Sequence, residues 1–384
     1  MSVTAAQGFV ASGLACGIRK EKLDLALVRS TVPAVGAGMF TANRMRAAPV
    51  IVSREHLELA EPQAVVANSG TANAATGVRG ELDARATAAE AGRLLGLAAE
   101  EVLVLSTGVI GAPLPLEKVL PGLEHAAAAL SPEGGAAAAE AILTTDTHAK
   151  QAASHGPGFV VGGMAKGSGM IHPNLATMLA VVTTDYPLEP GEAIELLRPA
   201  VAESFNSISV DGECSTNDAV ILLANGASGA SRNDEAFAEV LHTVCRNLAA
   251  QIVADGEGAT VVAEIDVLGA ASGPEATAIA RRIATSPLVK TALFGRDANW
   301  GRILAAAGSA PYNGGYAHLD PARVTLDLNG VRVLEWGTPL GAEPSLDGDV
   351  CTIALDLGLG DGRASYLTSD LSYDYVRINA EYRS

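Results

Sequence analysis

A threonine where a polar loop meets a buried strand is the residue of this chain best suited to act as a nucleophile. Residues 162–176 hold four glycines and a proline, and we expect them to form a Gly-rich polar loop. The run 177–184 is apolar and β-branched, which predicts a buried strand. A threonine hydroxyl needs an adjacent base, and its own α-amine can serve once the preceding peptide bond is cut. Self-cleavage between Ala176 and Thr177 is therefore one interpretation, and a threonine that merely begins a strand is the other.

Two polar turns follow other predicted strands. Thr107 and Gly108 come after the apolar run 102–105, and a hydroxyl with a backbone N–H at such a turn could stabilise an oxyanion. The strand 64–67 opens into the small, polar segment 68–77. Segments of this kind line pockets in α/β proteins or simply form surface loops, and the pattern leaves both open.

Three other features could bind a polar substrate. Residues 144–147 place three threonine hydroxyls around one carboxylate, which could bind substrate or cap a turn. Lys166, within the expected loop, could pair with a carboxylate or stay solvated. Glu257 lies between two glycines at the end of a predicted helix, where it could accept an ammonium group or remain in water.

The elements that must position these residues alternate along the chain. Helices are predicted at 82–95, twice within 125–141, and at 190–205, 237–252 and 273–286. Strands are predicted at 23–28, 36–40, 219–223, 261–265, 288–294 and 351–357, with a hairpin at 324–334 turning through Asn-Gly. The alternation indicates an α/β protein. With 384 residues, we expect two domains or two halves that share a core.

The composition of the chain argues against several classes of binding partner. Twenty-six basic residues against 43 acidic ones give a net charge of −17 without a basic run, which argues against nucleic acid and anionic membranes as partners. The four cysteines form no CxxC pair, which argues against a zinc site and a disulfide scaffold. The chain start lacks a signal-peptide pattern and no apolar run reaches membrane-spanning length, so we expect a cytoplasmic protein.

Taken together, eight motifs in order resemble the ornithine acetyltransferase family, the glutamate N-acetyltransferases of arginine biosynthesis. They lie at 68–74, 106–108, 144–147, 163–167, 175–179, 215–218, 255–260 and 295–302. The resemblance implies an α/β fold with sheets layered between helices, of the ornithine-acetyltransferase-like N-terminal-nucleophile type. It also implies that self-cleavage yields an α chain, 1–176, and a β chain, 177–384, which associate as an α2β2 heterotetramer or a larger assembly.

The family pattern also implies roles for individual residues. Thr177 is expected to be the nucleophile, and Thr107 with Gly108 the oxyanion hole. The amino-acid substrate is expected to contact Thr144, Lys166, Thr177, Glu257, Asn379 and Ser384. These roles suit the residue types, because lysine and an amide can bind a carboxylate and Glu257 can bind an ammonium group.

The implied reaction is a ping-pong transfer of acetyl from N2-acetylornithine to glutamate through an acyl-threonine, without a metal or organic cofactor. Some family members also use acetyl-CoA, and the sequence does not distinguish the two kinds. An N-terminal-threonine amidohydrolase or aminopeptidase is the alternative enzyme, which would release the acyl group to water. A non-catalytic amino-acid-binding protein is the third interpretation, and it would leave the chain uncut.

Overall fold

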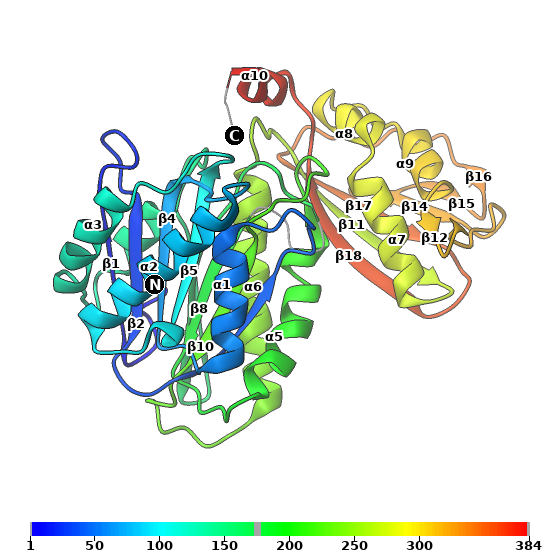
Figure 1. The fold of residues 1–384 in the computed structure, drawn as a ribbon. Coiled ribbons are helices and arrows are strands. Elements are labelled where there is room, and N and C mark those ends of the chain that lie inside the picture. Colours follow the sequence, from blue (N-terminus) through cyan, green and yellow to red (C-terminus); the bar gives the residue numbers. More distant parts are fainter. Residues whose placement is uncertain (1, 173–177, 382–384) are drawn as a thin grey trace. The chain divides into compact units, whose positions relative to one another are not determined.

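The computed structural model describes residues 2–172 and 178–381, which divide into two compact units (Figure 1). The first unit comprises the described residues up to Asn206 together with Glu213–Ile252. The second comprises Ser207–Gly212 and the described residues from Val253 onward.

One four-stranded sheet of the first unit is covered by helices. Its order is β1 (Phe9–Leu14), β2 (Leu25–Ser30), β4 (Ala64–Thr71) and β5 (Val102–Val109), with β4 and β5 parallel. The helices on one face are α1 (Ala48–Leu59), α2 (Gly77–Leu95) and α3 (Leu116–Ala128). Successive side chains of a strand point to opposite faces, so Leu25 and Leu27 face these helices while Ala26 and Val28 face the other way.

A second sheet packs against that other face. Its order is β3 (Val35–Phe40), β10 (Ala219–Ala224), β8 (Leu179–Thr184), β7 (Phe159–Lys166) and β6 (Lys150–Gly156). Apolar residues of both sheets form one core, to which α4 (Gly135–Ala141) adds three alanines. Two further helices lie on the outer face, α5 (Glu192–Ala202) and α6 (Asp234–Ala254) (Figure 1). The first unit therefore has two sheets layered between helices, as predicted.

The second unit is built on one larger sheet. Its order is β16 (Thr338–Pro339), β15 (Val331–Glu335), β14 (Thr325–Leu328), β17 (Val350–Asp356), β11 (Val262–Ala270), β18 (Gly362–Ser369) and β9 (Ile208–Ser209). Three helices share its apolar core, α7 (Gly273–Ala284), α8 (Pro287–Phe294) and α9 (Trp300–Ala307). A last helix, α10 (Tyr373–Glu381), follows β18. The short elements are η1 (Ala99–Glu101), η2 (Phe205–Ser207), β12 (Pro311–Tyr312) and β13 (Gly315–Tyr316).

Local predictions were wrong at four places. Residues 68–71 belong to strand β4 and residues 106–109 to strand β5, where the sequence predicted a loop and a turn. Residues 288–294 form helix α8 and not a strand, because Ser286 caps the helix by accepting the N–H of Val289 and Pro287 occupies its first turn. Residues 162–166, with Lys166, belong to strand β7 and not to a loop. A Cβ at Gly162 would lie 2.3 Å from the backbone oxygen of Ser2, so this glycine allows a close approach of two backbones within the sheet layer.

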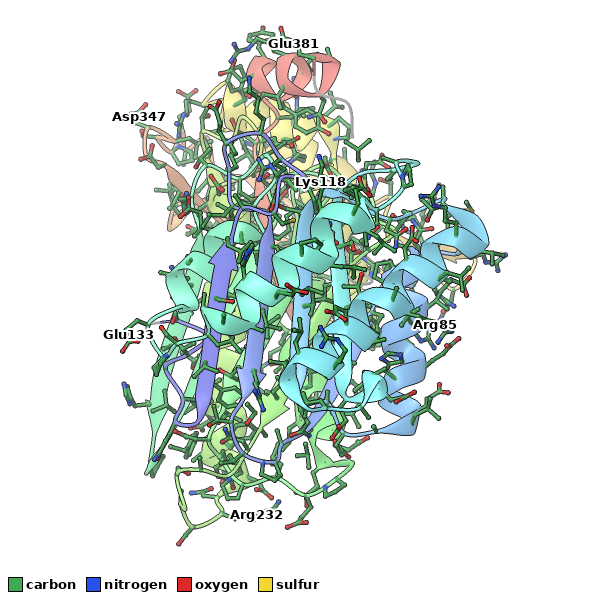
Figure 2. The ribbon with its side chains drawn as sticks, turned by 60° about the vertical axis from the view of Figure 1, so that its left-hand side comes forward. Arg85, Lys118, Glu133, Arg232, Asp347 and Glu381 are labelled. Atoms are coloured by element: carbon green, nitrogen blue, oxygen red, sulfur yellow. The ribbon has the colours of Figure 1, made fainter. Side chains whose placement is uncertain are left out.

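The predicted Asn-Gly hairpin is confirmed, with β14 and β15 joined by Asn329 at φ 47° and Gly330 at φ 74°. Charged side chains such as Arg85, Glu133 and Arg232 lie on the outside of the first unit (Figure 2). In the described parts of the chain, none of the helices combines the length and the apolar character that a bilayer crossing would need.

Candidate functional site

The predicted oxyanion residues lie at the carboxyl end of β5. Thr107 pairs with Ser69 and Gly108 with Gly70 of the parallel strand β4, and a β-bulge at Gly70 and Thr71 then breaks the register. Thr107 is 3% exposed. The carboxyl ends of parallel strands are where α/β proteins commonly place their sites, and bulges re-aim groups there.

Position 108 accepts only glycine. Its φ is +133°, in the region that favours glycine, and a Cβ added there would lie 2.4 Å from the carbonyl carbon of Gly70. The backbone at Gly108 is therefore held in a conformation that a residue with a side chain could adopt only with strain.

Asn217 joins the end of β5 to the second sheet. Its Nδ2 donates to the carbonyl oxygens of Ala72, at 2.6 Å, and Ser106, at 2.8 Å. Ser106 also donates from Oγ to Oδ1 of Asn68 at 2.6 Å. Because these groups are buried, the loss of any of these hydrogen bonds would be costly. The hydrogen bonds therefore define the position of the end of β5 relative to β10.

Asp218 directly precedes β10, the strand next to β8. Asp218 is 0% exposed, and its Oδ1 accepts the N–H of Met178 at 3.0 Å. Burial raises the pKa of the Asp218 carboxyl well above its usual range, while the Met178 N–H and the Lys166 charge act in the opposite direction. The environment of this carboxyl group therefore favours its protonated form.

Lys166 is the last residue of β7 and pairs with Leu179 of β8. It is 2% exposed, and its charge acts on both Asp146 and Asp218. The strand order β10-β8-β7 therefore brings the candidate substrate-binding lysine, Met178 and Asp218 to the same end of one sheet.

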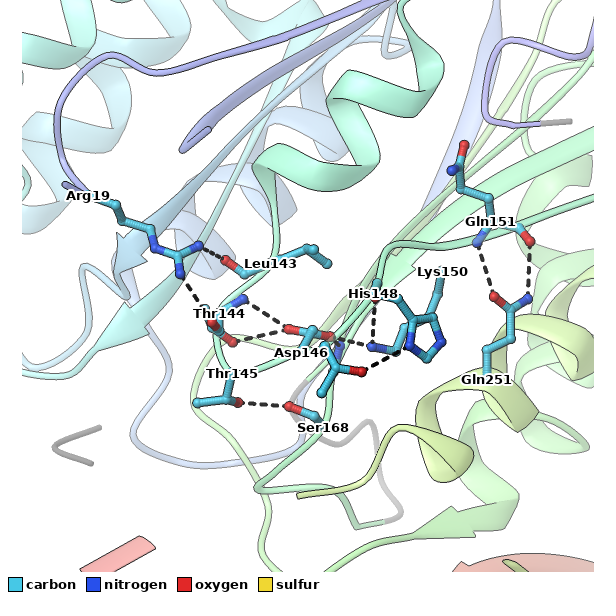
Figure 3. Close-up of polar contacts among 12 residues, drawn as sticks. Arg19, Leu143, Thr144, Thr145, Asp146, His148, Lys150, Gln151, Ser168 and Gln251 are labelled. Carbon is cyan, nitrogen blue, oxygen red and sulfur yellow. Dashed lines mark hydrogen bonds and ion pairs between the residues drawn. The ribbon is translucent and has the colours of Figure 1, made fainter. Parts of the chain in front are cut away.

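Asp146 is the centre of the network that holds Thr144 (Figure 3). Its Oδ2 accepts the Thr144 N–H at 2.9 Å and faces the Thr144 hydroxyl at 3.4 Å. Its Oδ1 accepts the Gly167 N–H at 2.6 Å and the ammonium of Lys150 at 2.7 Å, in an ion pair whose two side chains are both 0% exposed. Two candidate segments, 144–147 and 166–168, are thereby bound together.

The charge state of Asp146 follows from its neighbours. Burial alone would raise its pKa, but the nearby Lys166 and Lys150 outweigh that effect and hold the pKa well below its usual range. Asp146 is therefore ionised. Removing one partner of such a buried pair costs far more than the pair contributes.

A polar pocket opens beside Thr144. It has a volume of about 380 Å³, and charged side chains line it, among them Arg19, Lys22 and Glu140. The guanidinium of Arg19 donates to the carbonyl oxygens of Leu143 and Thr144 (Figure 3). The Thr144 segment thus borders a space large enough for a small polar ligand.

In the second unit, the structure joins two predicted binding residues directly. Asn379 of α10 donates from Nδ2 to Oε2 of Glu257 at 2.8 Å. The turn that carries Glu257 is held to the start of α10, because Ser372 donates from Oγ to the Gly258 carbonyl at 2.6 Å and accepts the Tyr375 N–H at 3.2 Å. An acid and an amide side by side can bind the ammonium and carboxylate of an amino acid.

Three predicted residues lie outside the described part of the chain. Ala176, Thr177 and Ser384 fall at positions 173–177 and 382–384, so their roles remain predictions. Of the others, Thr107, Gly108, Thr144 and Lys166 belong to the first unit, and Glu257 and Asn379 to the second.

Sequence reasoning assigned no role to Asn217, Asp218 or Lys150. One signal could have found the first two, because they directly precede the uninterrupted apolar run 219–224 and must therefore sit at the end of a buried strand. Nothing local marks Lys150, whose burial depends on Asp146.

Comparison with known proteins identifies relatives over nearly the whole chain. The ArgJ family model matches residues 10–384. The arginine biosynthesis bifunctional protein ArgJ of Symbiobacterium thermophilum is 48% identical over 400 aligned residues, covering 100% of this chain and 98% of its own. The protein of the same name from Mycolicibacterium paratuberculosis is 48% identical over 396 aligned residues, covering 100% and 96%.

Among solved structures, a similar one is the ornithine acetyltransferase of Mycobacterium tuberculosis in complex with ornithine. It is 42% identical in sequence, and the match covers 45% of this chain and 94% of that chain with a TM-score of 0.42.

Proposed function

Because the chain belongs to the ArgJ family, the ornithine acetyltransferase family that its motifs predicted, and is an acyltransferase, we propose that it moves an acetyl group from N2-acetylornithine to glutamate. The names of the relatives place them in arginine biosynthesis, which supports this pair of substrates. The observation that carries the proposal is the match over residues 10–384, because it covers every catalytic and binding residue predicted from the motifs.

Self-cleavage prepares the enzyme. The hydroxyl oxygen of Thr177 attacks the carbonyl carbon of Ala176, and the Thr107 hydroxyl with the Gly108 N–H stabilises the oxyanion. The C–N bond then breaks, its nitrogen takes the proton that the hydroxyl lost, and water hydrolyses the resulting ester. This leaves a carboxylate on Ala176 and a free α-amine on Thr177. The glycine-only geometry of position 108 supports its place in the oxyanion hole.

Acetyl transfer reuses the same groups. The Thr177 hydroxyl attacks the acetyl carbonyl of N2-acetylornithine, and the α-amine accepts the hydroxyl proton and passes it to the departing nitrogen of ornithine. Glutamate then takes the acetyl group from the acyl-threonine by the reverse sequence of proton transfers. No metal or organic cofactor takes part in these steps.

Six residues contact the amino acid in this proposal, and Thr177 is one of them. Lys166 and the amide of Asn379 bind its α-carboxylate, and Glu257 binds an ammonium group. Thr144 and Ser384 add hydroxyl contacts. The buried network of Asp146 supports the role of Thr144, because it defines the position of that segment.

Mass spectrometry of the denatured protein tests the proposal together with an acetyl-transfer assay. The parent protein should give two fragments that break between Ala176 and Thr177, and Thr177→Ala should give one uncut, inactive chain. Thr243→Ala is the matched control, because this exposed threonine only donates to a backbone oxygen within α6, and it should be cut and active. A cleaved and active Thr177→Ala protein would refute the assignment of the nucleophile.

The same assay tests whether acetyl-CoA is a second acetyl donor and whether the acetyl group is released to water. The relatives are called bifunctional, which favours acetyl-CoA as a second acetyl donor, so both donors are supplied in turn. Release of acetate without transfer to glutamate would instead indicate the amidohydrolase. Native mass spectrometry then tests the proposed α2β2 assembly.

A further inference from the structure

Asp218 holds the peptide group that follows the proposed nucleophile. The N–H that its Oδ1 accepts at 3.0 Å belongs to Met178, and hence to the peptide bond between Thr177 and Met178. Met178 and Asp218 precede the paired residues Leu179 and Ala219 of two parallel strands, and the Ala219 N–H donates to the Met178 oxygen at 3.1 Å. The aspartate is therefore fixed on the backbone of the residue next to Thr177.

The second carboxyl oxygen lacks a donor. Among the residues that the structure describes, Oδ2 of Asp218 has no hydrogen-bond partner although it is buried. The hydroxyls of Thr41 and Ser215 face the carboxyl, but the Thr41 hydroxyl already donates to the Ser215 carbonyl oxygen at 2.7 Å. The Ser215 hydroxyl accepts the Asn217 N–H at 3.0 Å and can still donate its own hydrogen to the carboxyl. A buried carboxylate would depend on that one hydroxyl, whereas a protonated carboxyl brings its own O–H and can donate to a hydroxyl oxygen.

The charged and titratable neighbours are few. The positive charge of Lys166 on β7 acts to lower the pKa of Asp218. Burial, and also the negative charge of Asp218, raise the pKa of the Cys214 thiol in the loop before β10. Burial nevertheless dominates and raises the pKa of Asp218 well above its usual range. By contrast, Lys166 and Lys150 hold Asp146, at the same end of the sheet, ionised, so the pKa values of the two aspartates are shifted in opposite directions.

We propose that Asp218 is a positioning residue that stands as a neutral carboxylic acid, fixes the peptide group between Thr177 and Met178, and keeps negative charge away from the α-amine freed at Thr177. The inference rests on the proposed self-cleavage. Covalent geometry alone keeps that amine within about 4 Å of the Met178 nitrogen, so it stays close to the carboxyl. A carboxylate there would favour the ammonium form, which cannot accept a proton from the hydroxyl, whereas a neutral acid leaves the amine free to act as the base.

The test compares Asp218→Asn with Asp218→Ala in the full chain. Asparagine keeps the shape and neutrality, with an oxygen for the Met178 N–H and an NH2 in place of the O–H. We expect Asp218→Asn to cleave itself and transfer acetyl within about tenfold of the parent, and Asp218→Ala to do both at least about 100-fold more slowly. The acid limb of the pH profile of kcat/KM should lie at the same pH in the parent and in Asp218→Asn. The inference would be overturned if the acid limb of Asp218→Asn lay lower than that of the parent by about one pH unit or more. It would also be overturned if Asp218→Asn were as impaired as Asp218→Ala. Both results would indicate that the parent protein works with an ionised carboxylate at position 218.

Asp185 provides the matched control. It is a buried aspartate just past the opposite end of β8, and both of its oxygens accept backbone N–H groups, from Val160 at 2.8 Å and Gln7 at 2.9 Å. Asp185→Asn should lower thermal stability without moving the acid limb. If the parent protein is neither cut nor active, the proposed function itself has failed.

The charge state is tested independently of activity. The infrared band of a protonated carboxyl group should be present in the parent at pH 7 and missing in Asp218→Asn. A parent spectrum without that band would overturn the inference whatever the outcome of the cleavage assay.

Discussion

At position 108 there is room for a hydrogen atom and nothing larger. Gly108→Ala puts a Cβ 2.4 Å from the Gly70 carbonyl carbon and strains a φ of +133°. We expect self-cleavage and turnover to fall by at least about 100-fold, because the oxyanion donor must move with the backbone. Cleavage is measured by the mass of the denatured protein and turnover by the transfer assay.

Gly111, in the turn that follows β5, is the control for backbone strain. It also has a positive φ, +82°, but no atom lies within 4 Å of an added Cβ. Gly111→Ala should cost a little stability and leave turnover within about threefold. Equal losses in the two variants would show that strain in the turn, and not the close approach to Gly70, explains the effect.

Residue types that do chemistry were predictable from the sequence, but residues that hold them were not. Thr107, Gly108 and Glu257 stand out because they follow directly after periodic runs in the sequence. Asn217 is different, since the carbonyl of Ser106 that it binds is 111 positions away along the chain. Only the packing of β5 beside the loop before β10 brings such partners together, and no local pattern encodes that distance.

Elements show the same division. The Asn329-Gly330 hairpin was predictable because its turn geometry is decided by two adjacent residues. The run 288–294 is mostly apolar and contains β-branched residues, a composition typical of a strand. Its helical conformation depends on the Ser286 cap and on burial against the sheet of the second unit. Gly162 was read as a loop residue because glycine marks turns, yet here it accommodates the backbone of Ser2.

Helix α8 is tied to the end of β18 by a buried lysine whose charge depends on pH. Lys290 is 3% exposed and donates from Nζ to the Thr368 hydroxyl at 3.1 Å and to the Ser369 carbonyl. Burial lowers the pKa of this ammonium to about 8, although Asp370 and Asp211 act in the opposite direction. An unfolded chain keeps its lysines protonated up to about pH 10.4.

Between these two values the unfolded chain binds more protons, so rising pH stabilises the folded protein. The gain from this group is at most about 3 kcal/mol and is complete above about pH 10.4. We expect the difference in unfolding free energy between the parent and Lys290→Met to shift in favour of the parent from pH 7.5 to pH 10, as measured by denaturant titration. The exposed Lys118→Met is the control, and an identical pH trend in both variants would contradict the role of Lys290.

Asn379 is the described residue of the C-terminal helix α10 for which we propose a role in substrate binding. Deletion of residues 379–384 removes its contact with Glu257 and the predicted contact of Ser384. We expect the KM for the amino-acid substrate to rise by at least about tenfold while kcat changes less, because the loss affects binding of the ground state and the transition state alike. Arg377→Ala is the control on the same helix, where an exposed arginine pairs with Asp374 at 2.9 Å. A deletion variant with an unchanged KM would exclude α10 from the site.

At the scale of the whole molecule, the proposed cut falls within an interwoven sheet. Of the second sheet of the first unit, β3, β6 and β7 precede the cut and β8 and β10 follow it. β7 pairs with β8 over six residues, and β3 pairs with β10 over six more. Apolar side chains from both sides of the cut share one core.

The two fragments should therefore stay together after cleavage without a covalent bond. Size-exclusion chromatography in native buffer should elute both in one peak, and only denaturant should separate them, because separation would expose two strand edges and the shared core to water. The uncut Thr177→Ala protein is the control and should elute at the same volume. Fragments that part in native buffer would show that the peptide bond, and not the sheet, holds the halves together, and would also argue against an assembly built from both chains.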